Sequence, residues 1–246
     1  YKGDPSSKEK LALVGKGVTY DPGGLNIKIR AMQEMTMDMS GAAVVLGIIR
    51  AAAELKLKKN IIVVAPVVEN AVGVNSYKPG AILDSYLGKT VEIGNTDAEG
   101  RLALADALAY VVKNYKPTQI VDFATLTGAV VAALGNDYAG LFSTDEKVDK
   151  IISSGNYVGE TVWRMPLPED YNEFLKSQRA DLNNISSVPE AGSITAALFL
   201  KNFVGDTPWT HIDIAGSAMR NKSKNYWPKY GTGFGVRLIL EWLRKN

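Results

Sequence analysis

The chain has 246 residues, with 28 lysines and arginines against 26 aspartates and glutamates, one histidine and no cysteine. These counts exclude disulfides, cysteine-based metal sites and a cysteine nucleophile, and the single His211 excludes a two-histidine metal site within one chain. The formal net charge of +2 does not favour a polyanionic partner, so nucleic-acid binding is not expected of this segment. Any metal ion must therefore be held mainly by oxygen ligands.

The start of the chain and its apolar runs indicate a cytoplasmic protein with no membrane partner. The first ten residues are polar, unlike a signal peptide. The longest apolar run, residues 41–49, is ended by Arg50 and is much shorter than the roughly 20 residues that cross a bilayer. The chain begins with Tyr1 rather than methionine, so we expect that a preceding segment is missing.

Short β-like runs alternate with helical runs, which predicts an α/β fold. Strands are expected at residues 11–14, 61–68, 91–93, 119–123, 140–143 and 210–214. Helices are expected at residues 41–57, 102–112, 145–153, 169–177, 195–203 and 235–243. Ser40 is the expected N-cap of the first helix, and Pro66 can end the second strand early. This order predicts a single three-layer domain, in which helices cover both faces of a mostly parallel, mixed central sheet.

Polar, glycine-containing segments follow three of the predicted strands, at residues 15–38, 94–101 and 125–128. In open α/β sheets, ligands bind beyond the carboxyl ends of the strands. The functional residues are therefore expected on these segments.

The segment 95–102 reads Asn-Thr-Asp-Ala-Glu-Gly-Arg-Leu and places Asp97, Glu99 and Arg101 at the start of a buried helix. Taken alone, acidic residues in this position are equally typical of helix capping. Arg101 could likewise form a simple salt bridge with Glu99. The segment therefore needs support from other parts of the chain.

Five blocks of sequence supply that support, because together they resemble the leucyl aminopeptidases, the dinuclear zinc peptidases also called cytosol aminopeptidases. The blocks lie, in the family's order, at residues 16–24, 38–43, 95–102, 125–128 and 213–216. The resemblance extends from about residue 10 to the end of the chain. It implies that residues 1–246 are a catalytic domain and that the N-terminal domain typical of the family is absent.

The resemblance also implies two divalent metal ions, zinc or manganese, with magnesium or cobalt as alternatives. Lys16 and Asp38 would bind one metal, Asp97 would bind the other, and Asp21 and Glu99 would bridge the pair. Four carboxylates so close together would repel one another without cations, and two divalent ions would balance their charge. Oxygen-rich ligands do not by themselves determine which metal is bound.

Two further residues would act in catalysis by the same resemblance. Lys28 would polarise the scissile carbonyl, and Arg101 would hold a bicarbonate ion that acts as general base, a role suited to its planar guanidinium. The two metals would activate the attacking water. The substrate-binding positions would be Met35, Asn95, Thr125, Leu126, Gly128, Ile185 and Ala215.

The implied substrates are peptides with a free N-terminus and a leucine-like or other neutral first residue, and the implied assembly is a trimer-based homo-hexamer. Two alternatives remain open: a folded core that is inactive without the N-terminal domain, and an accessory DNA-binding role. His211 lies on an alternating strand and is interpreted as a structural histidine. Asp213, on the same face, is interpreted as a partner of backbone groups.

Overall fold

The computed structural model describes all residues, 1–246, and has a six-stranded sheet at its centre, in the order β3-β1-β7-β11-β8-β9. The strands are β1 (Leu11–Gly15), β3 (Ile61–Val64), β7 (Gln119–Ala124), β8 (Ala139–Ser143), β9 (Val162–Arg164) and β11 (Trp209–Asp213). Strands β3, β1, β7 and β11 are parallel, whereas β8 runs antiparallel to β11 and carries β9 parallel to itself. The predicted mostly parallel, mixed sheet is confirmed.

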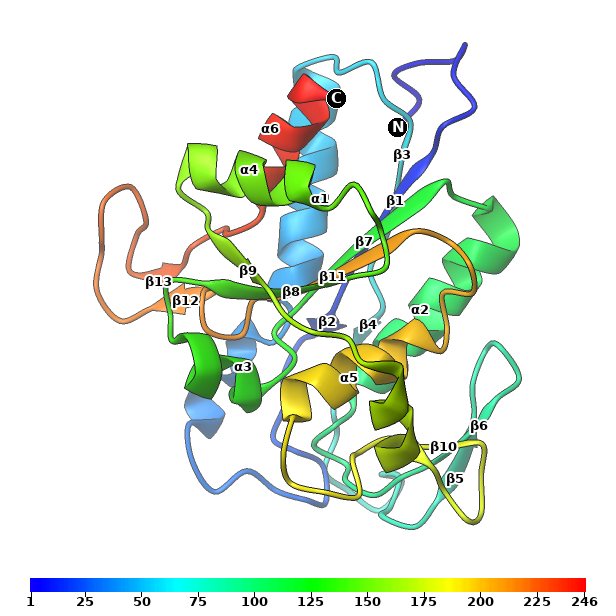
Figure 1. Ribbon diagram of the computed structural model, residues 1–246. Coiled ribbons are helices and arrows are strands. Elements are labelled where there is room, and N and C mark those ends of the chain that lie inside the picture. Colours follow the sequence, from blue (N-terminus) through cyan, green and yellow to red (C-terminus); the bar gives the residue numbers. More distant parts are fainter.

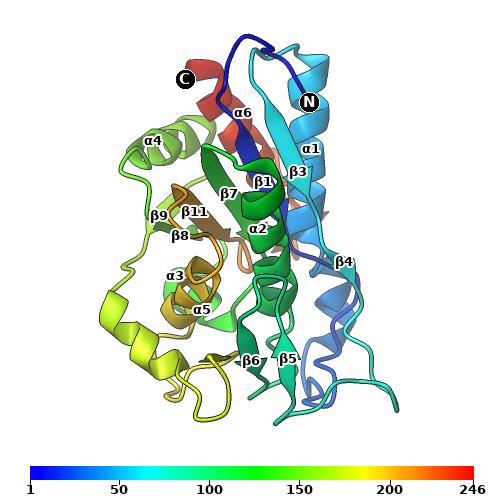
Figure 2. The same cartoon turned by 90° about the vertical axis from the view of Figure 1, so that its right-hand side faces the viewer.

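Helices cover both faces of this sheet (Figures 1 and 2). One face carries α1 (Ser40–Glu54), α4 (Asp149–Val158) and α6 (Val236–Lys245), and the other carries α2 (Gly100–Tyr115), α3 (Gly128–Leu134) and α5 (Gly192–Lys201). Two 3-10 helices, η1 (Met32–Met37) and η2 (Glu169–Leu175), lie in the connections. The expected three-layer α/β architecture is therefore present.

Three small sheets lie outside the central one. One has three strands, β10 (Leu182–Asn183), β6 (Thr90–Glu92) and β5 (Ile82–Asp84). The other two are strand pairs, β2 (Gly17–Val18) with β4 (Val67–Val68), and β12 (Met219–Arg220) with β13 (Tyr230–Gly231). Apart from residues 91–93 and 67–68, none of these strands was expected, because segments of two or three residues are too short to show periodicity.

The central sheet separates two apolar cores, since successive side chains of a strand point to opposite faces. In β1, Leu11 and Leu13 join the core shared with α1, α4 and α6, whereas Ala12 and Val14 join the core shared with α2 and α5. All of β1 is buried. The continuous apolar runs of the sequence therefore correspond to strands that are covered on both sides.

Two expected boundaries are wrong at the start of helices. Met39 is the N-cap of α1, and the hydroxyl of Ser40, its first helical residue, donates to the carbonyl of Met37 at 2.5 Å. The helix expected from residue 145 begins at Asp149, because the Asp145 carboxylate accepts a hydrogen bond from the backbone of Lys147 and holds a turn.

Two other expected elements also differ from the structure. The strand expected over 61–68 stops at Val64, and Val67–Val68 leaves the central sheet to pair with β2, as the break at Pro66 allows. The helix expected over 169–177 is the 3-10 helix η2. The residues of α3 were not expected to be helical, although Thr127 caps that helix by accepting a hydrogen bond from Val130.

The stretch Met32–Glu54 is long and apolar enough to cross a membrane when judged by length and composition. Core helices satisfy the same test. Here α1 forms most of that stretch, and its buried residues pack on β1, β7 and α6. The fold therefore uses this helix as part of its core.

The first turn of α1 lies directly against the carboxyl ends of β1 and β7. The backbone of Ala42 donates to the carbonyl of Lys16 at 2.8 Å, and Lys16 donates to the carbonyl of Phe123 at 2.9 Å. A Cβ atom on Gly41 would lie 2.1 Å from the Phe123 oxygen and 2.7 Å from the Lys16 nitrogen. Only glycine fits there, and this close approach places the start of α1 beside Lys16.

We expect Gly41→Ala to destabilise the fold by about 1–3 kcal/mol or more, because the added methyl group overlaps backbone atoms that cannot move aside. Urea unfolding of the metal-free protein measures the change. Gly73→Ala is the matched control, since a Cβ atom there meets nothing within 4 Å. Equal stability of the two variants would contradict this account of the helix–sheet contact.

Candidate functional site

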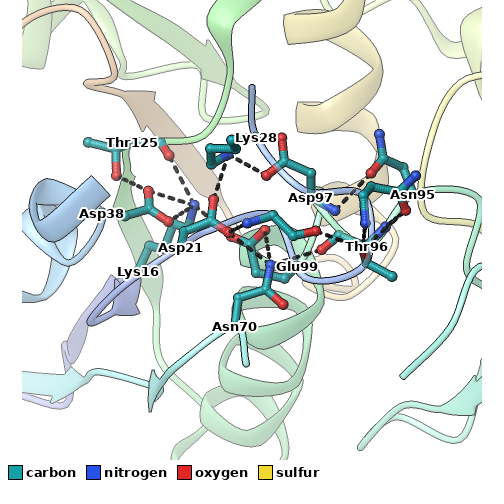
Figure 3. A network of polar contacts seen from close by, with 12 residues as sticks. Lys16, Asp21, Lys28, Asp38, Asn70, Asn95, Thr96, Asp97, Glu99 and Thr125 are labelled. Carbon is teal, nitrogen blue, oxygen red and sulfur yellow. Dashed lines mark hydrogen bonds and ion pairs between the residues drawn. The ribbon is translucent and has the colours of Figure 1, made fainter. Parts of the chain in front are cut away.

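Polar side chains from distant parts of the chain converge where β1 and β7 end and α1 and α2 begin. Lys16 follows β1, Asp38 precedes α1, Glu99 is the N-cap residue of α2, and Thr125 follows β7. Figure 3 shows these side chains and Asp21 pointing toward one another. The cluster therefore lies at the carboxyl edge of the sheet, where the sequence predicts the functional residues.

Three carboxylates form the centre of the cluster. Asp21, Asp38 and Glu99 each have an oxygen within 4.8 Å of the others, and all three residues are buried. Neither Glu99 nor any other side chain caps the N-terminus of α2. The alternative interpretation of segment 95–102 as a simple capping motif is therefore wrong.

Lys16 lies among these carboxylates and is only 3% exposed. Its Nζ atom is 2.8 Å from Asp38 Oδ1 and 3.1 Å from Glu99 Oε1, and it donates to the carbonyl of Thr125 at 3.1 Å. Burial by itself would lower the pKa of Lys16, but Glu99 and Asp38 raise it above its ordinary value. Lys16 is thus a cation here, and coordination of a metal by its amine would require loss of that proton.

Lys28 joins Asp97 to the cluster. Its Nζ atom lies 2.8 Å from Asp21 Oδ2 and also donates to Asp97. The Asp97 side chain is 31% exposed and does not belong to the group of three close carboxylates. Of the five predicted metal ligands, the structure brings four together and leaves Asp97 at the edge, linked through Lys28.

The charges and unpaired atoms of the cluster fit divalent cations. Two lysines face four carboxylates, which leaves negative charge uncompensated. Asp38 Oδ2 and Glu99 Oε1 are buried and close to Lys16, yet neither has a partner in hydrogen-bond geometry. Burial raises the pKa of Asp38 to about 7, with Lys16 opposing the change, and burial also raises the pKa of Asp97. Carboxylate oxygens with a lysine amine are a suitable donor set for such ions.

Asn70 is a residue of this site that the sequence did not reveal. Its Nδ2 atom donates to Asp21 Oδ1 at 2.8 Å, to the Thr96 carbonyl at 3.0 Å and toward Glu99 Oε2 at 3.4 Å. The only sequence signal for Asn70 was its position just beyond the carboxyl end of an apolar run. The other functional segments were located by the same kind of position. Asn70 orients two carboxylates at once, as residues around metal ligands commonly do.

A second buried asparagine, Asn184, holds the segment that carries Asp97. It accepts hydrogen bonds from the backbone of Gly94 and Asn95 and donates to the Asn95 carbonyl at 2.7 Å. The Asn95 side chain in turn accepts from the backbone of Asp97 at 2.8 Å. Asn95, a predicted substrate-binding residue, therefore shapes the loop that presents Asp97.

Arg101 is buried in the first turn of α2 and makes no ion pair with Glu99 or any other carboxylate. One guanidinium nitrogen donates to the Asn184 carbonyl at 2.8 Å, while Nε has no partner. Burial lowers the pKa of Arg101 to about 10, so the side chain stays charged at neutral pH. A buried positive charge with an unpaired hydrogen-bond donor is a suitable binding position for an anion.

The remaining predicted substrate residues lie on the connections around the cluster. Thr125 donates to Asp38 Oδ1 at 2.7 Å, and Gly128 begins α3. Met35 lies on η1, and Ile185 packs where Gly94 lacks a side chain. Leu126 and Ala215, which follow β7 and β11, are both half-buried. The contact of these residues with a substrate stays a prediction.

His211 is a structural residue. It is fully buried, and its Nδ1 atom lies 2.6 Å from Asp122 Oδ1, while Trp209 donates to the other oxygen of Asp122 at 2.7 Å. Burial would lower the pKa of His211, but Asp122 raises it above its ordinary value. The expected structural role is borne out by these contacts.

A buried set of carboxylates and lysines at the carboxyl edge of an α/β sheet defines the protein as one with a candidate metal centre. The chain belongs to the cytosol aminopeptidase family, since the model of that family's catalytic domain matches residues 1–240. The resemblance seen in the five sequence blocks is thereby confirmed.

Curated relatives agree with this assignment. The chain is 52% identical to a probable cytosol aminopeptidase of Protochlamydia amoebophila, 49% to one of Chlamydia caviae and 50% to one of Cenarchaeum symbiosum. These matches cover 100%, 100% and 99% of this chain, but 50%, 50% and 51% of the relatives. The chain thus spans about half the length of the curated relatives it matches.

The raised pKa of Asp38 leads to a prediction about stability. The folded carboxyl titrates at about 7 against an ordinary value of 3.8, so it stabilises the metal-free fold at low pH, and this contribution is lost as the pH rises from about 4 through 7. In Asp38→Asn, the loss of folding stability between pH about 4 and 7 should be smaller than in the unmodified chain. Urea unfolding in the presence of a chelator, at several pH values, measures it.

Asp137→Asn is the control for this experiment. The pKa of Asp137 is lowered, chiefly by hydrogen bonds from Lys224 and Arg220, so its effect on stability lies below pH about 4. Its pH profile above pH 4 should match that of the unmodified chain. An Asp38→Asn profile that also matches would show that Asp38 does not titrate in this range.

Proposed function

We propose that this chain is the catalytic domain of a metal-dependent aminopeptidase that releases N-terminal residues from peptides. The observation that carries the proposal is the buried group of Asp21, Asp38 and Glu99 around Lys16, whose negative charge is only partly compensated. Membership of the cytosol aminopeptidase family and the names of the relatives support this reaction class.

Two divalent cations are proposed to bind in this cluster, zinc or manganese, with magnesium or cobalt as alternatives. Lys16 and Asp38 would hold one, Asp97 the other, and Asp21 and Glu99 would bridge them. Bound there, the ions would supply Lewis-acid polarisation of the scissile carbonyl, a more acidic attacking water and a position for the free α-amine of the substrate.

Lys28 is proposed to stabilise the negative charge that develops on the carbonyl oxygen of the substrate. Burial would lower its pKa, but hydrogen bonds to Asp21 and Asp97 raise it above the ordinary value, so the ammonium keeps its proton and remains a donor. A charged donor fixed near a developing oxyanion lowers the barrier more than one in water does.

Arg101 is proposed to hold a bicarbonate ion that serves as general base. The unpartnered Nε atom, the buried positive charge and the neighbouring N-terminus of α2 support an anion in this place. A borrowed base also suits a chain whose only histidine is paired with Asp122 inside the sheet.

The proposed substrates are peptides with a free N-terminus and a neutral, leucine-like first residue. The predicted side-chain positions Met35, Ile185 and Ala215 are apolar, as is Leu126 in the cleft, and none of them brings a charge. A trimer-based homo-hexamer in the cytoplasm is proposed as the working form.

The protein loaded with zinc or manganese should hydrolyse leucine 4-nitroanilide, and a chelator should abolish the reaction. Asp97→Ala should lower kcat/KM at least about 100-fold, more than loss of a residue outside the ligand set. Asp84→Ala, which removes an exposed carboxylate on β5, is the matched control.

A loaded chain that shows no turnover would contradict activity of this domain alone. A chain extended to the full length of the relatives then separates the two remaining explanations: turnover only in the longer chain identifies an inactive isolated core. Tight, salt-dependent binding of DNA by the present chain would instead favour the accessory DNA-binding role.

The role of Arg101 predicts a dependence of the rate on bicarbonate. Adding bicarbonate to degassed buffer should raise kcat of the unmodified protein, and Arg101→Met should lower kcat about 10²–10⁴-fold, the usual contribution of a general base, and remove the dependence. A rate that does not respond to bicarbonate in the unmodified protein would rule this role out.

A further inference from the structure

Two connections that carry proposed substrate residues meet at the end of β11. The first, residues 125–128, joins β7 to α3, and the second, residues 214–218, follows β11 (Figure 1). Asp213, the last residue of β11, lies between them and is 1% exposed. It is too deeply buried to touch a substrate, so any effect it has on the reaction must act through its neighbours.

The Asp213 carboxylate accepts a hydrogen bond from three groups on these connections. Oδ1 accepts from the backbone of Leu126 at 3.0 Å and from the backbone of Ala215 at 3.1 Å, and Oδ2 accepts from the Thr127 hydroxyl at 2.7 Å. Two of the residues so held are proposed to meet the substrate: Leu126 lines the cleft, and Ala215 belongs to the side-chain pocket. One carboxylate therefore fixes their spacing.

The same hydrogen bonds extend to α3. The Thr127 hydroxyl that donates to Asp213 also accepts a hydrogen bond from the backbone of Val130, which caps the helix. At its other end, connection 125–128 is attached to the metal cluster, because Thr125 donates to Asp38 and accepts from Lys16 (Figure 3). The connection is thus held at one end by the candidate metal ligands and at the other by Asp213.

The chemistry of Asp213 is unusual for a residue with only a packing role. No lysine, arginine or histidine nitrogen lies within ion-pair distance of it. Burial raises the pKa of Asp213, and the charge of His211 opposes this change together with the three hydrogen bonds. Burying a carboxylate is costly unless such bonds satisfy it. Three hydrogen bonds shared between its two oxygens hold the carboxyl group in one orientation, which suits a residue that sets a geometry.

We propose that Asp213 is a positioning residue, which sets the distance between the metal cluster, the cleft residue Leu126 and the side-chain pocket residue Ala215 and thereby determines how well the cleft distinguishes N-terminal side chains. This inference rests on the proposed aminopeptidase function.

The test compares substitutions that alter single contacts. Asp213→Asn keeps an oxygen for the two backbone donors but replaces the acceptor of the Thr127 hydroxyl with an amide group. Thr127→Val removes the hydroxyl, and Thr127→Ser retains it. Glu160→Gln is the matched control: Glu160 is also 1% exposed and accepts from the backbone of Gly235 and Leu238 at the start of α6, on the other face of the sheet.

The readout is the ratio of kcat/KM for leucine 4-nitroanilide to that for alanine 4-nitroanilide, measured with the metal content of each variant. Asp213→Asn and Thr127→Val should lower this ratio about tenfold, equivalent to about 1.4 kcal/mol, with unchanged metal content. Thr127→Ser and Glu160→Gln should keep the ratio of the unmodified protein. A ratio that is unchanged in both Asp213→Asn and Thr127→Val would overturn the proposal.

Hydrogen exchange makes the outcome independent of the proposed function. In Asp213→Ala, which removes both acceptor oxygens, exchange of the Leu126 and Ala215 amides should become faster, while Gly235 and Leu238 stay protected; Glu160→Ala should show the reverse. If the loaded protein has no activity, the proposed function fails, and these exchange rates alone decide whether Asp213 holds the two connections. Unchanged exchange at Leu126 and Ala215 would then overturn the positioning role.

Discussion

Repulsion among buried carboxylates is the constraint on which this structure depends. Asp21, Asp38 and Glu99 come from three separate segments and are held within a few ångströms of one another, where burial and the charge of Glu99 raise the pKa of Asp38. The fold tolerates this because Lys16 enters the same space. That entry requires a bare backbone: a Cβ atom on Gly100 would lie 2.1 Å from the Lys16 side chain. The close packing of α1 and α2 on the sheet therefore serves to bring unlike charges together.

The layer order of the fold could be predicted from the sequence, whereas many local details could not. Apolar runs such as β1 and β7 are buried on both faces, and no other arrangement hides them. The failed cap at Ser40 depends on the backbone conformation of Met39, which no residue pattern reveals. The pairing of β4 with β2 likewise depends on where the chain turns after Pro66, a tertiary effect beyond local propensity.

The candidate site shows the same division. Short, distinctive sequence motifs contain Lys16, Asp21, Asp38 and Glu99, so the sequence alone predicts that these residues converge. Asn70 lies 49 residues from Asp21 and 29 from Glu99, in a segment without a distinctive pattern. Residues that orient others are recognised by their hydrogen bonds, and those bonds exist only after the chain has folded. The contacts that support the site were therefore the part that sequence reasoning missed.

The strand pair β2–β4 has a consequence for how this domain can vary. Its ladder continues past the strands, since Thr19 donates to the Val68 carbonyl and Asn70 donates to the Tyr20 carbonyl. The segments that carry Asp21 and Asn70 are therefore joined edge to edge and share one register. A single residue inserted between Pro66 and Asn70 would turn the side-chain amide of Asn70 to the opposite face of the ladder, away from Asp21. Insertions and deletions should be tolerated farther along this loop instead, where Val74 is exposed and the space beside Gly73 is open.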